Sequence, residues 1–108
     1  RIDCVLAFQD ICEPLLIDLE KLQPFGPENS EPIFAAKNVR VASSRIVGQT
    51  HRRMTLSQGS DGGPIIDAVA FHVDPNIPAP AGFEQLVFRL KRNRWNGRSS
   101  PQIIIEKT

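Results

Sequence analysis

Five basic side chains and the tryptophan of this chain crowd one ten-residue stretch. Residues 89–98 read RLKRNRWNGR and include no acidic residue. Guanidinium and ammonium groups bind phosphates, and an aromatic ring can stack on a nucleobase. The dipeptide Asn96-Gly97 is typical of a tight turn, so the stretch is predicted to form the tip of a β-hairpin. These residues offer the chemistry of binding a nucleic-acid strand.

Further arginines are expected to lie on the same side of the molecule if the strands form an OB-type barrel. Such barrels bind single strands across their second and third strands and with the loops that join strands one to two and four to five. The candidate nucleic-acid-binding residues are Arg45, Arg52, Arg53, Arg89, Lys91, Arg94, Trp95 and Arg98. Two alternatives stay open: the arginines could simply solvate the surface, and Trp95 could fold back over Phe88 or Ile104 as a structural ring.

Charge is distributed unevenly along the chain. The formal net charge is +1, yet residues 1–34 hold two basic and seven acidic residues, a net charge of −5. Residues 35–108 hold eleven basic and five acidic residues, a net charge of +6. A phosphate backbone would meet the field of this second part, which is therefore the part expected to bind an anionic strand.

Residues that could perform catalysis or hold a metal are scarce. His51 and His72 fall on different predicted strands without carboxylates at ligand spacing, which favours strand or surface roles. Cys4 and Cys12 form no CxxC motif and are predicted to be reduced thiols. The glycine-rich residues 59–63 lack the lysine of a P-loop. We therefore predict no catalytic residue and no metal site in this chain.

Hydrophobic periodicity predicts the elements that precede the basic part. Residues 2–8 alternate and predict a short strand whose even-numbered side chains are buried. Residues 13–22 place leucines on one side and charges on the other, which predicts a helix that begins near Glu13 and ends before Pro24. Residues 22–34 contain three prolines and are expected to form an ordered strap.

Five further strands are predicted to form an OB-type Greek-key barrel. Their expected spans are residues 37–47, 52–58, 65–73, 83–91 and 102–106. Composition predicts a turn at residues 59–64 and an irregular bridge without a helix at residues 74–82. The predicted fold class is mainly β, a five-stranded barrel preceded by a short strand and an N-terminal helix.

Strand alternation assigns side chains to the interior of this barrel. The residues expected to point inward are Phe34, Met54, Leu56, Phe71, Leu86, Phe88, Leu90, Ile103 and Ile105. Asp67 shares its parity with Phe71, which would aim a carboxylate at the core. Because an unpaired buried carboxylate is costly, either a bulge that turns Asp67 outward or a hydrogen-bond donor beside it is expected.

Six short motifs lie along the chain, at spacings that can be compared with those of a known family. They read LQPFGPEN at residues 22–29, EPIF at 31–34, KNVRV at 37–41, DAVAF at 67–71, NRWNG at 93–97 and QIIIE at 102–106. Together they resemble the junction between the catalytic core and the OB-fold domain of bacterial RecJ-type single-stranded-DNA exonucleases. The resemblance covers nearly the whole chain. It departs at Ser30, where the family commonly has proline, and at His72, where it more often has glycine.

The resemblance implies a function and a division of the chain. Residues 25–108 would be the OB-fold domain, and residues 1–24 the tail of a preceding, DHH-associated domain with its connecting helix. The implied module is non-catalytic and binds single-stranded DNA, which it guides to the upstream core of a 5′–3′ exonuclease of DNA repair and recombination. That core would hold manganese or magnesium, and this chain would need no cofactor.

The resemblance also implies partners and a location. The expected partners are single-stranded DNA, the catalytic core of the same chain and a repair or single-strand-binding protein, in the bacterial cytoplasm and away from membranes. The competing interpretation is a structural or protein-interaction module that packs on the nuclease core or recruits a repair partner. The modest net charge and a Trp95 that could be buried motivate this alternative.

Overall fold

Six strands form one sheet, and helix α1 packs against it. The computed structural model describes residues 1–59 and 63–107, so the turn predicted at residues 59–64 lies in part outside the described residues. In chain order the elements are β1 (Cys4–Val5), η1 (Phe8–Asp10), α1 (Glu13–Lys21), β2 (Phe34–Val47), β3 (His51–Gln58), β4 (Ile65–Ala70), β5 (Gly82–Trp95) and β6 (Arg98–Lys107). The prediction of a mainly β chain is confirmed.

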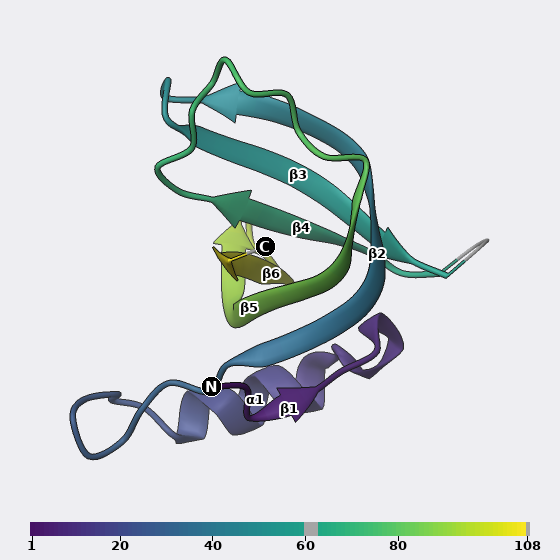
Figure 1. Cartoon of the computed structure of the whole chain (residues 1–108). Coiled ribbons are helices and arrows are strands. Elements are labelled where there is room, and N and C mark those ends of the chain that lie inside the picture. The colour runs from purple at the N-terminus through teal and green to yellow at the C-terminus, as the bar shows by residue number, and fades with distance from the viewer. Residues whose placement is uncertain (60–62, 108) are drawn as a thin grey trace.

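The strands pair with one another in a closed cycle. The sheet order is β1-β2-β3-β4-β6-β5, and β5 also pairs with β2. Strand β2 serves two neighbours because it is long: residues 34–40 pair with β5 and residues 39–47 pair with β3. The pairs β1–β2 and β4–β6 are parallel, and the others are antiparallel. Five strands therefore form a continuous ring of pairings, and β1 is attached at its edge (Figure 1).

The interior of the ring is filled by side chains that strand alternation assigns to it. The residues expected inside and found buried are Phe34, Met54, Leu56, Leu86, Phe88, Leu90 and Ile103. Ile105 is partly buried and packs against the same cluster. The period-two pattern therefore predicts the core correctly on β3, β5 and β6.

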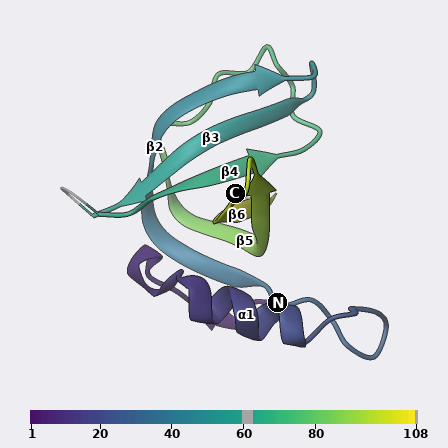
Figure 2. The ribbon, with the colours of Figure 1, turned by 180° about the vertical axis from the view of Figure 1, so that it is seen from behind.

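Helix α1 begins and ends where the sequence predicts. Cys12 is the N-cap residue, and Pro14 lies in the first turn, where its missing N–H leaves no hydrogen bond unmade. Leu16 is buried, with 2% of its surface exposed. The helix lies across one end of the ring, outside β2 and β5 (Figure 2). No helix among residues 1–59 and 63–107 is long and apolar enough to cross a membrane.

The segment before the helix differs from the predicted strand. Only Cys4–Val5 is a strand, it is exposed, and it pairs with the start of β2. Phe8 is 1% exposed and belongs to the core, whereas Ile2 is 42% exposed. The expectation of a regular strand over residues 2–8 with even-numbered side chains buried is thus wrong, because the chain leaves the sheet after β1 and turns into a short 3-10 helix. Cys4 and Cys12 are free thiols, as predicted.

Strand β4 presents the opposite face to the interior from the one expected. Ile66 and Ala68 are buried, so Asp67 between them lies on the outer face and is half-buried. The strand ends at Ala70, and Phe71 beyond it is 49% exposed. The inward placement of Phe71 is therefore wrong, and Asp67 faces outward through ordinary strand alternation, not through the expected bulge. The β3–β4 register contains no bulge, because the outward parity of Asp67 needs none.

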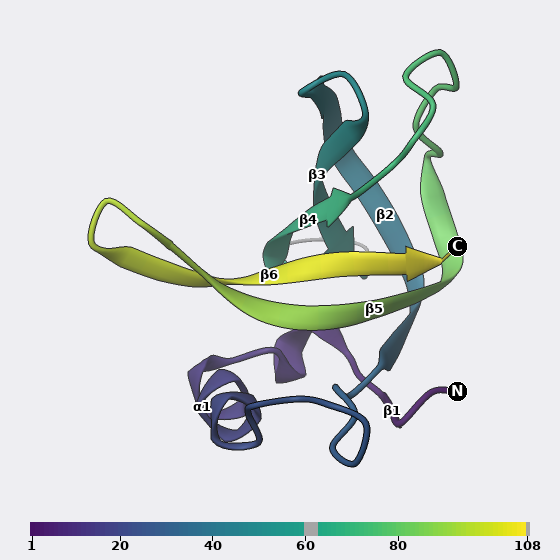
Figure 3. The same ribbon diagram turned by 90° about the vertical axis from the view of Figure 1, so that its left-hand side faces the viewer.

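The β5–β6 hairpin is longer than predicted. Asn96 and Gly97 both have positive φ, 50° and 73°, which suits a two-residue type I′ turn and confirms the predicted hairpin tip. Strand β4 pairs with β6 only at residues 102–104, so the hairpin before them is a two-stranded ribbon. Figure 3 shows this ribbon extending beyond the rest of the sheet. The bridge at residues 74–82 contains no helix, as predicted.

Candidate nucleic-acid interface

Two arginines face each other across neighbouring strands on the outer side of the ring. Arg45 of β2 and Arg53 of β3 are directly paired in the antiparallel register. Like charges directly opposite each other destabilise a sheet. Neither arginine forms an ion pair with any described residue. An anion from outside the chain would relieve their repulsion.

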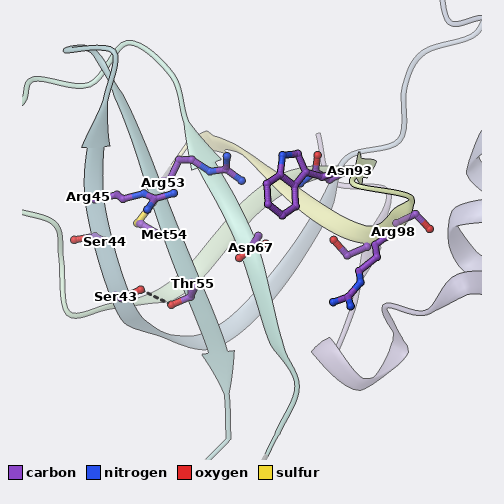
Figure 4. A pocket seen from close by; sticks show the side chains of 12 residues that line it. Ser43, Ser44, Arg45, Arg53, Met54, Thr55, Asp67, Asn93 and Arg98 are labelled. Carbon is purple, nitrogen blue, oxygen red and sulfur yellow. Dashed lines mark hydrogen bonds between the residues drawn. The ribbon is translucent and has the colours of Figure 1, made fainter.

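The two arginines line a groove with a volume of about 820 Å³. One wall comes from β2 and β3, and the other comes from the β5–β6 hairpin, which contributes Trp95 and Arg98. Figure 4 shows Arg45 and Arg53 extending from the first wall, with Arg98 on the far side of β4. The structure therefore brings four of the predicted site residues together in one groove.

Trp95 is exposed on the hairpin wall of this groove. It forms the last pair before the turn, opposite Arg98, and 72% of its surface is accessible. With this exposure the indole does not fold back over Phe88 or Ile104, and the interpretation of Trp95 as a structural ring is wrong. An exposed indole with apolar faces is available for stacking.

Residues outside the predicted site line the floor and edges of the groove. Ser43, Thr55 and Asp67 are direct neighbours across β2, β3 and β4, and the first two hydroxyl oxygens lie 2.6 Å apart. The other lining residues absent from the prediction are Ser44, Met54, Asn93, Ser99 and Ser100. Thr55 shares parity with Arg53, so alternation alone places both on one face; the hairpin residues carry no comparable signal.

Three other predicted site residues lie outside this groove. Arg89 forms ion pairs with Glu31, at 3.5 Å, and with Glu106, at 2.6 Å. Arg94 pairs with Glu20 at 3.4 Å. Lys91 and Arg94 line a second cavity of about 340 Å³, between α1, the strap and β5. The structure thus separates these residues from the arginine pair and gives two of them acidic partners.

Arg52 does not point outward. It is 8% exposed, and its guanidinium donates a hydrogen bond to the carbonyl oxygen of Ile77. Arg52 shares strand parity with the buried Met54 and Leu56, so its side chain lies at the end of the interior and ties the bridge at residues 74–82 to β3. The prediction of an outward, strand-binding Arg52 is wrong for this reason.

Arg92 joins the hairpin to α1. Its side chain is 8% exposed and contacts the carboxylates of Glu13, at 2.5 Å, and Glu20, at 2.9 Å. The hydrogen bond from Arg92 lowers the pKa of Glu20, and the same bond raises the pKa of Arg92. The acidic N-terminal part therefore neutralises a portion of the basic stretch at residues 89–98.

We expect this contact to weaken in acid. Because the pKa of Glu20 is lower in the folded chain than in the unfolded one, its stabilisation is fully present above the ordinary value of about 4.5 and is lost as the pH falls through the folded-state value. The thermal unfolding midpoint of the natural sequence should therefore fall more steeply with acidity than that of Glu20→Gln. Asp18→Asn is the control, because it removes an exposed carboxylate on the same helix that forms no ion pair with a described residue. Parallel profiles for all three proteins would refute the expectation.

The two histidines lie close together in the structure. Their rings are 6.0 Å apart, and the ring of His51 contacts Phe71 edge-on at 4.9 Å. Among residues 1–59 and 63–107, no group of three or more His, Cys, Asp and Glu side chains is placed to hold a metal ion. The described residues therefore supply no donor set to which a metal-dependent step could be assigned.

Comparison with known proteins connects this chain to a family. Residues 2–107 match the family model described as the RecJ OB domain. The single-stranded-DNA-specific exonuclease RecJ of Escherichia coli K12 is 34% identical over 77% of this chain and 14% of its own length. The exonuclease of the same name from Dickeya dadantii is 30% identical over 82% of this chain and 15% of its own length. The one from Bacillus subtilis is 28% identical over 98% of this chain and 14% of its own length.

Proposed function

Because this chain belongs to the RecJ OB domain family, we propose that it binds single-stranded DNA in the groove between β2, β3 and the β5–β6 hairpin. The observation that carries the proposal is the Arg45–Arg53 pair, which faces the groove without an acidic partner among the described residues. A DNA strand would supply the phosphates that neutralise this pair and would release its own counterions. On this proposal the ring of strands is an OB-fold barrel.

The division of labour in the groove follows from the chemistry of its walls. Arg45, Arg53 and Arg98 contact phosphates, whose spacing does not depend on sequence. Trp95 stacks on one base, a contact worth about 1–3 kcal/mol in single-strand-binding proteins. Arg89, Lys91 and Arg94 lie outside this groove and contribute only to the longer-range field that attracts the strand.

The rest of the function depends on a longer protein. The chain spans 14% of the length of the E. coli and B. subtilis relatives. We propose that the parent is a 5′–3′ exonuclease of repair and recombination in the bacterial cytoplasm, with manganese or magnesium in a catalytic core outside this chain. Residues 25–108 would guide the strand to that core, residues 1–24 would end the preceding domain, and a repair or single-strand-binding protein is a further proposed partner.

Titration of the chain with a labelled oligothymidylate tests the proposal. We expect binding at low salt, an association constant that falls as salt rises, and a change in the fluorescence of Trp95 on saturation. Trp95→Ala should weaken binding by about 1–3 kcal/mol without lowering thermal stability, because the ring is 72% exposed. Binding that does not depend on salt, or no binding even at low salt, would reject the proposal.

A protein-interaction module remains the second candidate function, and one feature favours it. Apolar side chains gather at the end of the ring where β2 turns into β3 and the bridge at residues 74–82 crosses. The exposed members are Ile46, Val47, Phe71 and Ile77, with exposures of 38% to 59%. Apolar groups exposed together are typical of surfaces that another protein covers. A folded chain that fails to bind any single strand would point to this alternative.

A further inference from the structure

The groove proposed to bind DNA contains one carboxylate. Asp67 is the acidic residue among its lining side chains, and it is half-buried on β4. It makes no hydrogen bond or ion pair with any described side chain, so no structural partner accounts for its position. A negative charge on the floor of a phosphate-binding groove opposes the attraction of the arginines for phosphate, so Asp67 is better suited to contact a base than the backbone of the strand.

Sheet register separates the positive and the negative parts of the floor. Arg45 and Arg53 form one cross-strand row, and Ser43, Thr55 and Asp67 form another. The rows lie two residues apart along β3, which corresponds to about 7 Å in an antiparallel strand. Phosphates are drawn to the first row and repelled from the second. Figure 4 shows Arg45, Arg53 and Asp67 in the groove. A bound nucleotide would therefore lie with its phosphate at the arginines and its base over Asp67.

We propose that Asp67 makes the groove selective among bases and favours guanine, an inference that rests on the proposed function. An ionised carboxylate can only accept hydrogen bonds, through two oxygens. Guanine presents two adjacent donors, N1–H and the N2 amino group, which match those oxygens. Cytosine and adenine present one amino group beside an acceptor nitrogen, and thymine presents one N–H between two carbonyl oxygens. Guanine is therefore the base that pairs with Asp67 through two bonds and without repulsion.

The test compares oligonucleotides that differ at one base. The natural chain is titrated with a strand of about 15 thymidines, near the upper site size of one OB fold, and with the same strand carrying one central guanine or adenine. A single guanine avoids four-stranded structures. We expect the guanine strand to bind about tenfold more tightly than the thymidine strand, the discrimination typical of a bidentate pair. In Asp67→Asn the preference should move to adenine, because an amide pairs with adenine through one donor and one acceptor.

The preference is a ratio of affinities measured on one protein, so a partly unfolded variant does not distort it. Asp67→Ala should bind all three strands alike, and Asp18→Asn, which removes a carboxylate far along the chain on α1, should keep the guanine preference. Salt-dependent binding with equal affinities in the natural chain, or a guanine preference that survives in Asp67→Asn, overturns this inference and leaves the proposed function standing. If no strand binds at low salt, the proposed function fails and the inference fails with it.

Discussion

Phe8→Ala is expected to lower the free energy of unfolding of the whole chain by about 3–5 kcal/mol. Phe8 is 1% exposed and lies in the same cluster as Phe88 and Leu56, although it precedes the predicted domain boundary after residue 24. Its backbone N–H also donates to the side chain of Gln58 on β3, at 2.7 Å. Removing the phenyl group of Phe8 leaves a cavity between the N-terminal segment and the ring of strands. Neighbouring side chains can fill such a cavity only in part.

Chemical denaturation followed by far-ultraviolet circular dichroism and by Trp95 fluorescence measures this effect. Far-ultraviolet circular dichroism includes the signal of α1, and Trp95 fluorescence reports on the hairpin, so coincident transitions would mean that α1 unfolds together with the hairpin. Ile17→Ala is the matched control, because Ile17 is 42% exposed on α1 and should change stability by less than about 1 kcal/mol. A Phe8→Ala protein as stable as the natural one would show that the N-terminal segment is a separate unit.

The sequence predicts much of the fold because its strands alternate clearly. On β3, Met54 and Leu56 are the apolar residues and share one parity, and Leu86, Phe88 and Leu90 do so in the middle of β5, although Phe83 of the other parity is also buried near its start. Only one face of such a strand can be buried, so register follows from composition. The Asn96-Gly97 turn is equally local, since both residues tolerate the positive φ that the turn requires.

Strand β4 shows why other parts could not be predicted. Both faces of this strand carry apolar side chains, with Ile66 and Ala68 on one face and Val69 on the other. Because Phe71 has the largest apolar side chain here, the pattern predicts that its face of the strand is buried, and this prediction is wrong. In the structure the strand stops at Ala70, and His72 has a φ of 57°, so the chain turns away before Phe71 could reach the core.

The basic residues of the candidate site fall into two groups because segments far apart in the sequence contact each other. In sequence, Arg92 and Arg94 look as free to bind phosphate as Arg98 does. The fold brings Glu13 and Glu20 of α1 beside the first two, from more than seventy residues away in the case of Glu20. No local pattern contains that pairing. The outward placement of Arg45 and Arg53 is instead predicted correctly by strand parity, and neither forms an ion pair with a described residue.

Replacing both Arg45 and Arg53 with alanine is expected to weaken single-strand binding about 25-fold at about 0.1 M salt. Each lost phosphate contact lowers the slope of log K against log salt by about 0.7 on a single strand, which over the decade from 1 M corresponds to about fivefold per arginine. The slope itself should become less steep by about 1.4. Titrations of a labelled oligothymidylate at several salt concentrations measure both quantities.

Stability separates loss of contact from loss of fold in this variant. Because the two charges are direct cross-strand neighbours, their removal should leave the thermal unfolding midpoint unchanged or raise it. Arg94→Ala is the matched control: Arg94 is 71% exposed but lies outside the groove and beside Glu20, so its loss should change affinity by far less. If Arg94→Ala weakens binding as much as the double replacement does, the strand lies on the α1 side of the hairpin instead. A midpoint that falls while the salt slope stays constant would assign the arginine pair to folding and not to DNA.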